Sequence, residues 1–237
     1  MNKETGQLRW GLLEIFMVFA GIMGVGMLFS LYADRMMIKF TRLGIADSEF
    51  SLFILSFLLQ FFSTVILVLL FTVWINRASL KDLGLQKADR QDLLRYGLLG
   101  GIMLMMLVTV MGILINYWQP QISPQVFEEM LRSVNGDTGF IIMFIIGAVM
   151  APFTEELYYR GMIYPVLRNY LGPLGGALVA GLLFGIAHWD FWRTLPLAVG
   201  GAVLCYIYEK SGSIWVPMLA HGMWNGIMSV IVYFSII

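Results

Sequence analysis

Residues 138–164 read TGFIIMFIIGAVMAPFTEELYYRGMIY, and this stretch decides the fold. Its apolar side chains form a run comparable to the roughly 20 residues that a helix needs to cross the hydrocarbon core of a bilayer. Three charged residues, Glu155, Glu156 and Arg160, nevertheless lie within it. Placing one such charge in the hydrocarbon costs about 2.5–3.5 kcal/mol on insertion scales. The stretch therefore predicts a membrane-crossing helix whose charged residues are present for a functional reason.

The composition of the whole chain agrees with a membrane protein. Of its 237 residues, 59% are hydrophobic and only 13% are charged, too few to cover a soluble surface. The candidate spans are 10–32, 52–75, 96–115, 138–164, 173–192, 194–208 and 213–236. We therefore predict an all-α fold, a polytopic transmembrane bundle of seven helices, with eight helices as the alternative. Gly200 and Gly201 lie in the shortest stretch and should let another helix approach closely.

The charged residues are informative by their positions. The 15 basic and 15 acidic side chains cancel, and no basic stripe indicates a nucleic-acid partner. With a cytoplasmic N-terminus, more lysine and arginine residues fall in inner segments than in outer ones, as the positive-inside rule expects. We therefore expect an integral, multi-pass protein of the plasma membrane with its N-terminus in the cytoplasm. The single cysteine, Cys205, lies in an apolar run and is expected to serve packing.

Two segments between the spans have a readable structure. Residues 76–92 are polar enough to form a cytoplasmic connector. Residues 123–134 begin with Ser123 and Pro124, which suit a helix N-cap and first turn. Apolar and charged residues then occupy opposite helical faces, the pattern of a helix that lies in the membrane interface. We expect a structural loop helix here, and a substrate gate is the alternative.

The two adjacent glutamates are predicted to differ in their surroundings. Glu156 and Arg160 are four residues apart, so they are neighbours on one helix face and can neutralise each other. Glu155 points to another face and has no partner on its own helix. It is therefore the candidate general base.

The chain has only two histidines, His188 and His221, and both lie in apolar surroundings. His221 and Asn225 are four residues apart and share a helix face. A lone histidine in an apolar helix is more often structural, but two of them beside a glutamate pair and an amide indicate a polar site. Asp190, two residues beyond His188, is a candidate to orient that imidazole. The aromatic and charged residues 189–193 are typical of a membrane-interface belt.

These side chains permit two forms of hydrolysis. A carboxylate beside an imidazole can hold and deprotonate a water, while a histidine and an asparagine donate hydrogen bonds to the developing oxyanion. Alternatively, Glu155, His188 and His221 could be three protein ligands of a zinc ion, with the fourth position left for water. The residues alone leave both open. A His-Glu-x-x-His motif is absent from the sequence, and no serine stands out as a nucleophile.

Three motifs in this order resemble those of the CPBP intramembrane proteases, which include the type II CAAX prenyl endopeptidases and the bacteriocin-processing or immunity proteins. The motifs are Glu155-Glu156-x-x-x-Arg160, Phe184-x-x-x-His188 and His221-x-x-x-Asn225. The stretch Asp82-Leu83-Gly84-Leu85 is also similar to those proteins. The resemblance covers roughly 80–237 as the catalytic helical core, and residues 1–79 would be additional N-terminal transmembrane helices.

The resemblance implies a role for each motif residue. Glu155 matches the catalytic carboxylate, His188 the histidine that holds the water, and His221 with Asn225 the oxyanion pair. Glu156 and Arg160 match the remaining polar positions, and a supporting role is expected for Arg160. The family has been described as metal-dependent and as glutamate-dependent, so zinc stays open as a cofactor.

The expected function is that of an intramembrane endopeptidase acting on a membrane-associated peptide or protein. A non-catalytic binding partner, such as a bacteriocin-immunity protein or a regulatory adaptor, would use the same bundle without needing Glu155. A transporter could also carry ionisable residues in its helices. Transporters commonly contain inverted repeats, and the sequence shows none.

Overall fold

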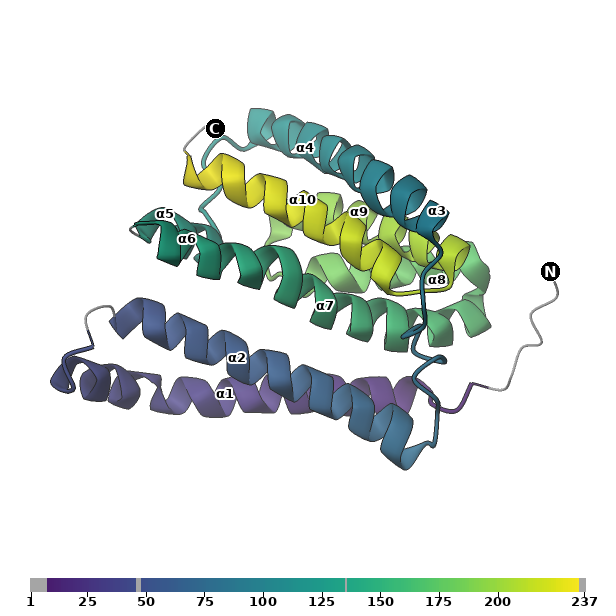
Figure 1. The fold of residues 1–237 in the computed structure, drawn as a ribbon, viewed down its shortest axis with the longest axis horizontal. Helices are drawn as coiled ribbons and strands as arrows, with labels where there is room; N and C mark the ends of the chain where they lie inside the picture. Colours follow the sequence, from purple (N-terminus) through teal and green to yellow (C-terminus); the bar gives the residue numbers. More distant parts are fainter. Residues whose placement is uncertain (1–7, 46–47, 135, 235–237) are drawn as a thin grey trace. The chain divides into compact units, whose positions relative to one another are not determined.

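The computed structural model describes residues 8–45, 48–134 and 136–234, which form helices and connecting turns with no strand (Figure 1). The predicted all-α fold is confirmed. The chain divides into two compact units, one spanning Arg9–Ala78 and the other extending from Ser79 onward. The residues that carry the predicted chemistry all lie in the second unit.

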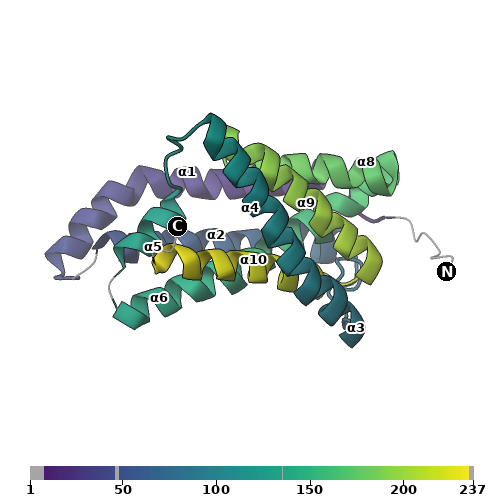
Figure 2. The ribbon, with the colours of Figure 1, turned by 90° about the horizontal axis from the view of Figure 1, so that it is seen from above.

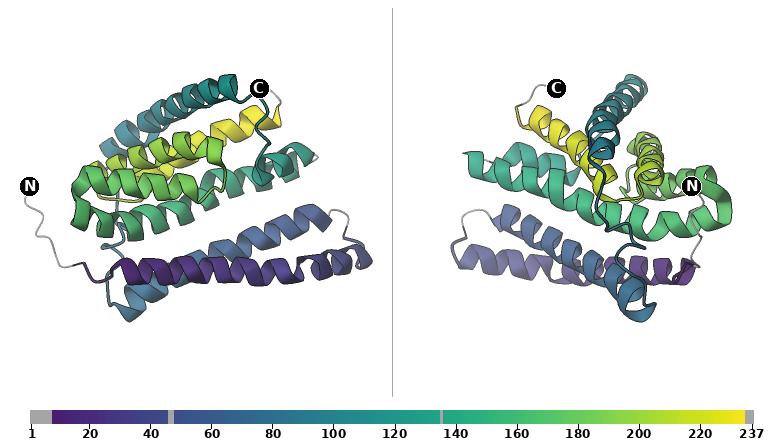
Figure 3. Two further views of the ribbon diagram at one scale, coloured as in Figure 1. Left: turned by 180° about the vertical axis from the view of Figure 1, so that it is seen from behind. Right: turned by 45° about the vertical axis from the view of Figure 1, so that its right-hand side comes forward.

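The first unit is a hairpin of two long helices that run side by side (Figure 3). Helix α1 spans Leu12–Arg42, and α2 spans Ser48–Leu69 and continues as the π-helical segment η1, Leu70–Ile75. Helix α1 continues ten residues beyond the predicted span, which ended at residue 32. No glycine or proline interrupts the ten residues that follow, so the helix continues until Gly44, whose φ of 72° ends it.

The second unit contains the remaining helices. They are α3 (Arg90–Asp92), η2 (Leu93–Leu99), α4 (Gly100–Trp118), α5 (Val126–Ser133), α6 (Gly136–Ile145), η3 (Ile146–Met150), α7 (Ala151–Glu155), η4 (Glu156–Ile163), α8 (Tyr164–Ile186), α9 (Phe191–Ser211) and α10 (Trp215–Tyr233). The three η segments are π-helical turns set into longer rods. Seen from above, α4, α9 and α10 lie beside one another (Figure 2).

Among the residues that the structure describes, five helices are long and apolar enough to cross a membrane. They are Leu12–Arg42, Ser48–Ile75, Arg90–Trp118, Gly136–Ile186 and Phe191–Ser211. The fourth is continuous by its hydrogen bonds but is broken at Gly172, where φ is 73° and ψ is 174°. Two of the predicted spans lie on either side of this break. Helix α10 is not among the five. The total of seven membrane spans therefore stays a prediction.

Helices α8 and α9 pack closely because glycines lie at their crossing. A Cβ on Gly201 would stand 2.9 Å from the Cα of Gly181, and one on Gly181 would collide with the carbonyl oxygen of Ala198. Small residues at such crossings let two backbones approach, so the prediction for Gly201 is confirmed. Helix α9 is longer than the predicted 194–208, because Asp190 caps its start and Gly212, in the left-handed conformation, ends it.

The connector before α3 holds the turn between α9 and α10. The amide of Ile214 donates to the carbonyl oxygen of Gly84 over 3.0 Å, and the Gln86 side chain donates to the Gly212 carbonyl over 2.6 Å. Leu83 is buried, and its carbonyl oxygen would be 2.9 Å from a Cβ on Gly161. The segment therefore packs against both the helix that carries the glutamates and the start of the helix that carries His221.

Helix α5 begins at Val126, two residues later than the sequence suggested. Its N-cap is Gln125, without a side-chain cap, so the predicted roles of Ser123 and Pro124 are wrong. Its apolar face packs inward: Leu131 is buried, and the ring of Phe127 occupies the space that a side chain on residue 147 would need.

Candidate active site

His221 lies between the two adjacent glutamates. Its Nδ1 is 2.8 Å from Oε1 of Glu156, and its Nε2 is 3.6 Å from Oε2 of Glu155. The side chains of His221 and Glu156 are 3% and 0% exposed, whereas that of Glu155 is 30% exposed. Glu155 was predicted to lack a partner on its own helix. The structure gives it one on another helix, and leaves it the accessible member of the pair.

The predicted pairing of Glu156 with Arg160 is confirmed. Nη1 of Arg160 is 2.9 Å from Oε1 of Glu156, and both side chains are fully buried. Nη2 of Arg160 donates to the main-chain carbonyl of Gly201 over 2.8 Å. Buried charges are tolerated only when they are paired and hydrogen-bonded. A continuous chain of contacts thus runs from Gly201 through Arg160 and Glu156 to His221.

Asn225, one turn after His221 on α10, is hydrogen-bonded to a main-chain carbonyl of the neighbouring helix. Its Nδ2 donates to the main-chain oxygen of Gly147 over 3.0 Å. Pro152 lies five residues after Gly147 and four after Ala148, and proline has no N–H to donate. The amide that would bond Gly147 in the π-helical register, or Ala148 in the α-helical register, is therefore missing where η3 meets α7. Such π-helical turns are frequent at functional sites.

His188 follows the last residue of α8 and lies in a turn. Its Nδ1 is 2.8 Å from the main-chain oxygen of Phe184. A carbonyl only accepts hydrogen bonds, so Nδ1 must carry a proton, and in the neutral imidazole Nε2 is then the nitrogen with the lone pair. The next residue, Trp189, has a φ of 54°, an uncommon conformation for a residue other than glycine. The backbone thus turns sharply beside this histidine.

Asp190 does not orient His188 as predicted. Its carboxylate accepts a hydrogen bond from the Arg193 amide over 3.0 Å and pairs with the Arg193 guanidinium. Asp190 therefore caps α9. The imidazole of His188 is oriented by the main-chain carbonyl of Phe184 instead. Arg193 also donates to the Ser123 carbonyl over 2.9 Å, which ties the segment before α5 to this turn. Trp189 and Phe191 are exposed, in keeping with the predicted interface belt.

The zinc alternative does not fit the arrangement of the side chains. Within the described part of the chain, no three histidine, cysteine, aspartate or glutamate side chains are close enough together to hold a metal ion. Glu155 and His221 are neighbours, but His188 does not join them as a third ligand. Zinc requires its ligands at about 2.0–2.3 Å. We therefore derive no catalytic step through a metal.

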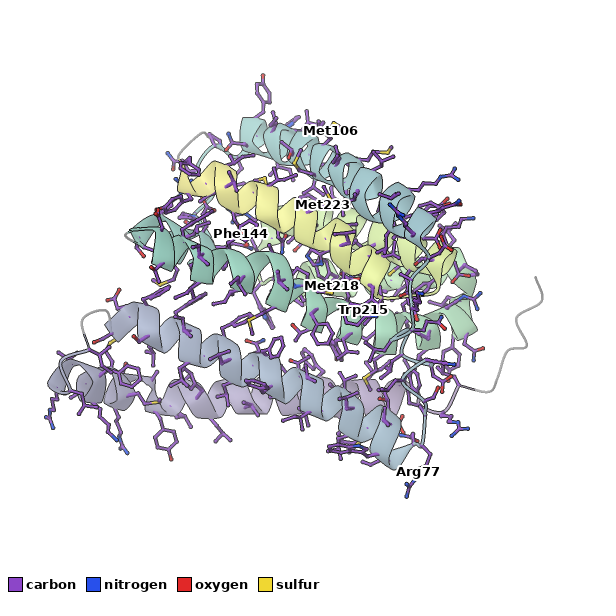
Figure 4. The ribbon with its side chains drawn as sticks, viewed as in Figure 1. Arg77, Met106, Phe144, Trp215, Met218 and Met223 are labelled. Atoms are coloured by element: carbon purple, nitrogen blue, oxygen red, sulfur yellow. The ribbon has the colours of Figure 1, made fainter. Side chains whose placement is uncertain are left out.

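An apolar cavity of about 710 Å³, largely open to the outside of the helices, borders α10. Its lining includes Phe144, Trp215, Met218 and Met223, whose positions along α6 and α10 can be followed in Figure 4. Gly222 and Gly226, the residues next to His221 and Asn225, also line it. The cavity therefore reaches the helix that carries the polar site.

Sequence reasoning missed three partners of the site: the carbonyls of Gly147 and Gly201, and the ring of Phe184. The first had a partial signal: in a regular α-helix Pro152 would leave the Ala148 oxygen without a partner, and only the π-helical register of η3 moves the missing bond to Gly147. The Gly201 carbonyl had only an indirect signal, because glycines predict a close helix approach but do not indicate which side chain will meet the carbonyl. Phe184 was noted only as a motif position.

Comparison with known proteins agrees with the motifs. Residues 137–227 match the family model described as type II CAAX prenyl endopeptidase Rce1-like, and every residue predicted for the site lies within them. A "Putative membrane peptidase YdiL" of Bacillus subtilis (strain 168) is 30% identical over 84 residues, which are 35% of this chain and 34% of that protein. The "Membrane-embedded CAAX protease MroQ" of Staphylococcus aureus (strain USA300) is 25% identical over 153 residues, which are 61% of this chain and 60% of that protein. The chain thus spans less than two thirds of either relative, and no solved structure matches it.

Proposed function

Since the chain carries a Rce1-like CAAX protease domain over residues 137–227, we propose that it is an intramembrane endopeptidase. It hydrolyses a peptide bond in a membrane-associated peptide or protein. The observation that best supports this proposal is the accessible carboxylate of Glu155 beside the buried, doubly contacted imidazole of His221. If Glu155 served only to stabilise the fold, we would expect its carboxylate to be buried like those of its partners in the network.

The proposed first step is the attack of a water on the peptide carbonyl carbon. Glu155 accepts the proton that the water loses, and Nε2 of His188, with its free lone pair, accepts a hydrogen bond that orients the water. The proton then passes from Glu155 to the amine as the carbon–nitrogen bond breaks. Each atom of the water is thus accounted for, its oxygen in the new carboxylate and its protons on the two products.

The oxyanion formed during the attack is stabilised by His221 and Asn225. In the proposed step His221 carries a proton on both nitrogens throughout: Nδ1 donates to Glu156, Nε2 donates toward the oxyanion, and neither proton is transferred. Asn225 has two N–H donors, and the one bonded to Gly147 holds the amide while the other is available. Glu156 and Arg160 act through His221, because Glu156, held by its ion pair with Arg160, contacts Nδ1 of the imidazole and so fixes its orientation.

We assign the apolar part of the substrate to the cavity beside α10. Its lining is apolar and includes Gly222 and Gly226, so a segment held there would lie against the helix that carries His221 and Asn225. A substrate that already lies in the membrane needs no further desolvation to enter. We also propose the plasma membrane as the location, with a cytoplasmic N-terminus, from the lysine and arginine distribution.

The decisive experiment compares wild-type protein with Glu155→Gln in proteoliposomes that contain a library of membrane peptides. Loss of cleavage in Glu155→Gln, with unchanged peptide binding, is the expected result. Glu129→Gln changes an exposed glutamate of α5 and serves as the matched control. Cleavage at the wild-type rate by Glu155→Gln contradicts the proposal and favours a binding-only role. A parallel arm with a zinc chelator should leave cleavage unchanged.

A further inference from the structure

The ring of Phe184 lies at the meeting point of the three helical rods that carry the site. Its side chain is 1% exposed. Its neighbours are the rings of Tyr159, His188 and His221 and the guanidinium of Arg160. A single buried side chain therefore contacts both histidines of the protein and the cation that anchors one of them.

Phe184 contacts His188 in two ways. Its carbonyl oxygen is 2.8 Å from Nδ1 of His188, and the two ring centroids are 4.8 Å apart with the planes at 66°. Helix α8 ends at Ile186, and the amide of His188 donates to the carbonyl oxygen of Gly185 over 3.3 Å in the turn that follows. The carbonyl of Phe184 sets which nitrogen carries the proton, and the ring sets the plane of the imidazole.

The other contacts of the ring orient the second histidine. The centroid of Phe184 is 5.7 Å from that of His221, and the planes are nearly perpendicular at 80°. The Arg160 guanidinium lies 5.0 Å from the centroid of the same ring. Aromatic pairs favour such edge-to-face arrangements, and a cation favours the face of a ring. The ring thus contacts His221 directly and also the end of its supporting ion-pair chain.

The ring itself has little freedom to move. A Cβ on Gly201 would be 3.1 Å from Cδ1 of Phe184, so a side chain there would press against the ring. Tyr159 closes another side, with its ring centroid 5.1 Å away and the planes at 88°. An aliphatic side chain could fill this space, but it has no plane with which to fix two imidazoles.

We propose that Phe184 is a positioning residue that fixes the mutual orientation of His188 and His221. Its effect on turnover rests on the proposed protease function, whereas its effect on the two imidazoles does not. The ring keeps His188, which orients the water, and His221, which binds the oxyanion, at a fixed distance from each other. The catalytic geometry is therefore set by a residue that does not itself touch the substrate.

The two histidines can be observed directly, because the chain has no others. The protein is labelled with 15N-histidine, reconstituted in nanodiscs, and its ring nitrogens are recorded by NMR in wild type and in Phe184→Leu. We expect one sharp set of signals for each histidine in wild type, with Nδ1 of His188 protonated. In Phe184→Leu both sets should broaden or shift toward mixed tautomers. Unchanged signals in this variant would overturn the proposal.

Two further measurements guard against loss of folding. Phe184→Met fills the space with a flexible chain and is measured in the same way if Phe184→Leu fails to fold. In wild type, cross-peaks from the Phe184 ring to both imidazoles are expected, and their absence also overturns the proposal. The matched control is Phe140→Leu, which removes a ring stacked on Tyr233 at 4.3 Å and should leave both histidine patterns unchanged.

Kinetics provides the functional readout. Misplacement of catalytic groups by about 1 Å costs on the order of 100-fold in rate, so kcat of Phe184→Leu should fall by about that factor while KM stays within about twofold. A raised KM with unchanged kcat would contradict a positioning role. If wild type cleaves no peptide, the protease proposal fails, and the NMR signals still decide the role of Phe184.

Discussion

The side-chain amide of Asn225 donates to the main-chain carbonyl of Gly147, five residues before Pro152. The proline lacks the N–H that would otherwise bond this carbonyl or its neighbour in the helix. A side chain of α10 thus completes the backbone of the rod that carries the glutamates. This contact fixes Asn225 next to the site and sets the register between the two helices.

Replacing Pro152 with alanine should weaken this contact. The new N–H can bond the carbonyl of Ala148 or Gly147, so the local helix regains a hydrogen bond and Asn225 loses its exclusive partner. We expect thermal stability to be retained or raised while kcat falls about tenfold, as for a misplaced oxyanion donor. Pro217→Ala is the control, because Pro217 lies in the first turn of α10, where no helical acceptor awaits an N–H. Equal effects of the two variants would contradict this account.

Glu156→Gln should strongly destabilise the fold. It leaves the guanidinium of Arg160 buried with no counter-charge, and breaking a buried ion pair in this way costs about 3–5 kcal/mol. The double variant Glu156→Gln/Arg160→Met should recover part of this loss, because it removes the uncompensated charge as well. Denaturant unfolding in detergent measures the effect.

The control for that experiment is the exposed pair of Glu128 with Arg132 on α5, 3.0 Å apart. Glu128→Gln should cost no more than about 1 kcal/mol, as is typical of surface ion pairs. If both glutamine variants lost the same free energy of unfolding, burial would not explain the cost of the Glu156 change.

The cap of α9 should make stability depend on pH. Burial raises the pKa of Asp190, but hydrogen bonds from the Arg193 amide and guanidinium outweigh it, so the pKa lies below its usual value of 3.8. A depressed pKa means that the stabilisation is fully present above about pH 4 and is lost as the pH falls further. Melting temperatures of wild type and Asp190→Asn should therefore differ at pH 6 and converge below pH 4. A constant difference at all pH values would refute the linkage.

Filling the apolar cavity should weaken substrate binding more than it slows chemistry. Val149 lines the cavity, and Val149→Trp places a large ring in it. We expect KM to rise about tenfold with little change in kcat, the result of losing binding that is equal in ground and transition states. Val110→Trp, at an exposed position of α4 outside the cavity lining, is the matched control. An unchanged KM for Val149→Trp would remove the cavity from the substrate path.

The sequence predicted those features that depend on local spacing. Apolar runs indicated helices, because a membrane leaves few other ways to satisfy backbone groups. The four-residue spacing of Glu156 and Arg160 predicted their ion pair, which the structure contains. The glycines of the stretch 194–208 predicted a close helix crossing, which Gly201 provides.

Features that depend on contacts between helices could not be predicted in this way. The partner of Glu155 is His221, on a helix far along the chain. The partner of His188 is a main-chain carbonyl and not Asp190, because the helix ends just before the histidine and the aspartate is used as a cap. The π-helical turns also escaped prediction, since periodicity assumes regular α-helix throughout.

The segment before α3 has a practical consequence. The Gly84 carbonyl accepts a hydrogen bond from the Ile214 amide, and Leu83 packs against Gly161, so the segment contacts both the start of α10 and the helix that carries the glutamates. These two contacts fix the axial position of α10 relative to the helix that carries the glutamates. A shortened protein that lacked this segment would keep the site residues but lose the alignment of the two helices that carry them. A minimal version of the core must therefore begin no later than Ser79.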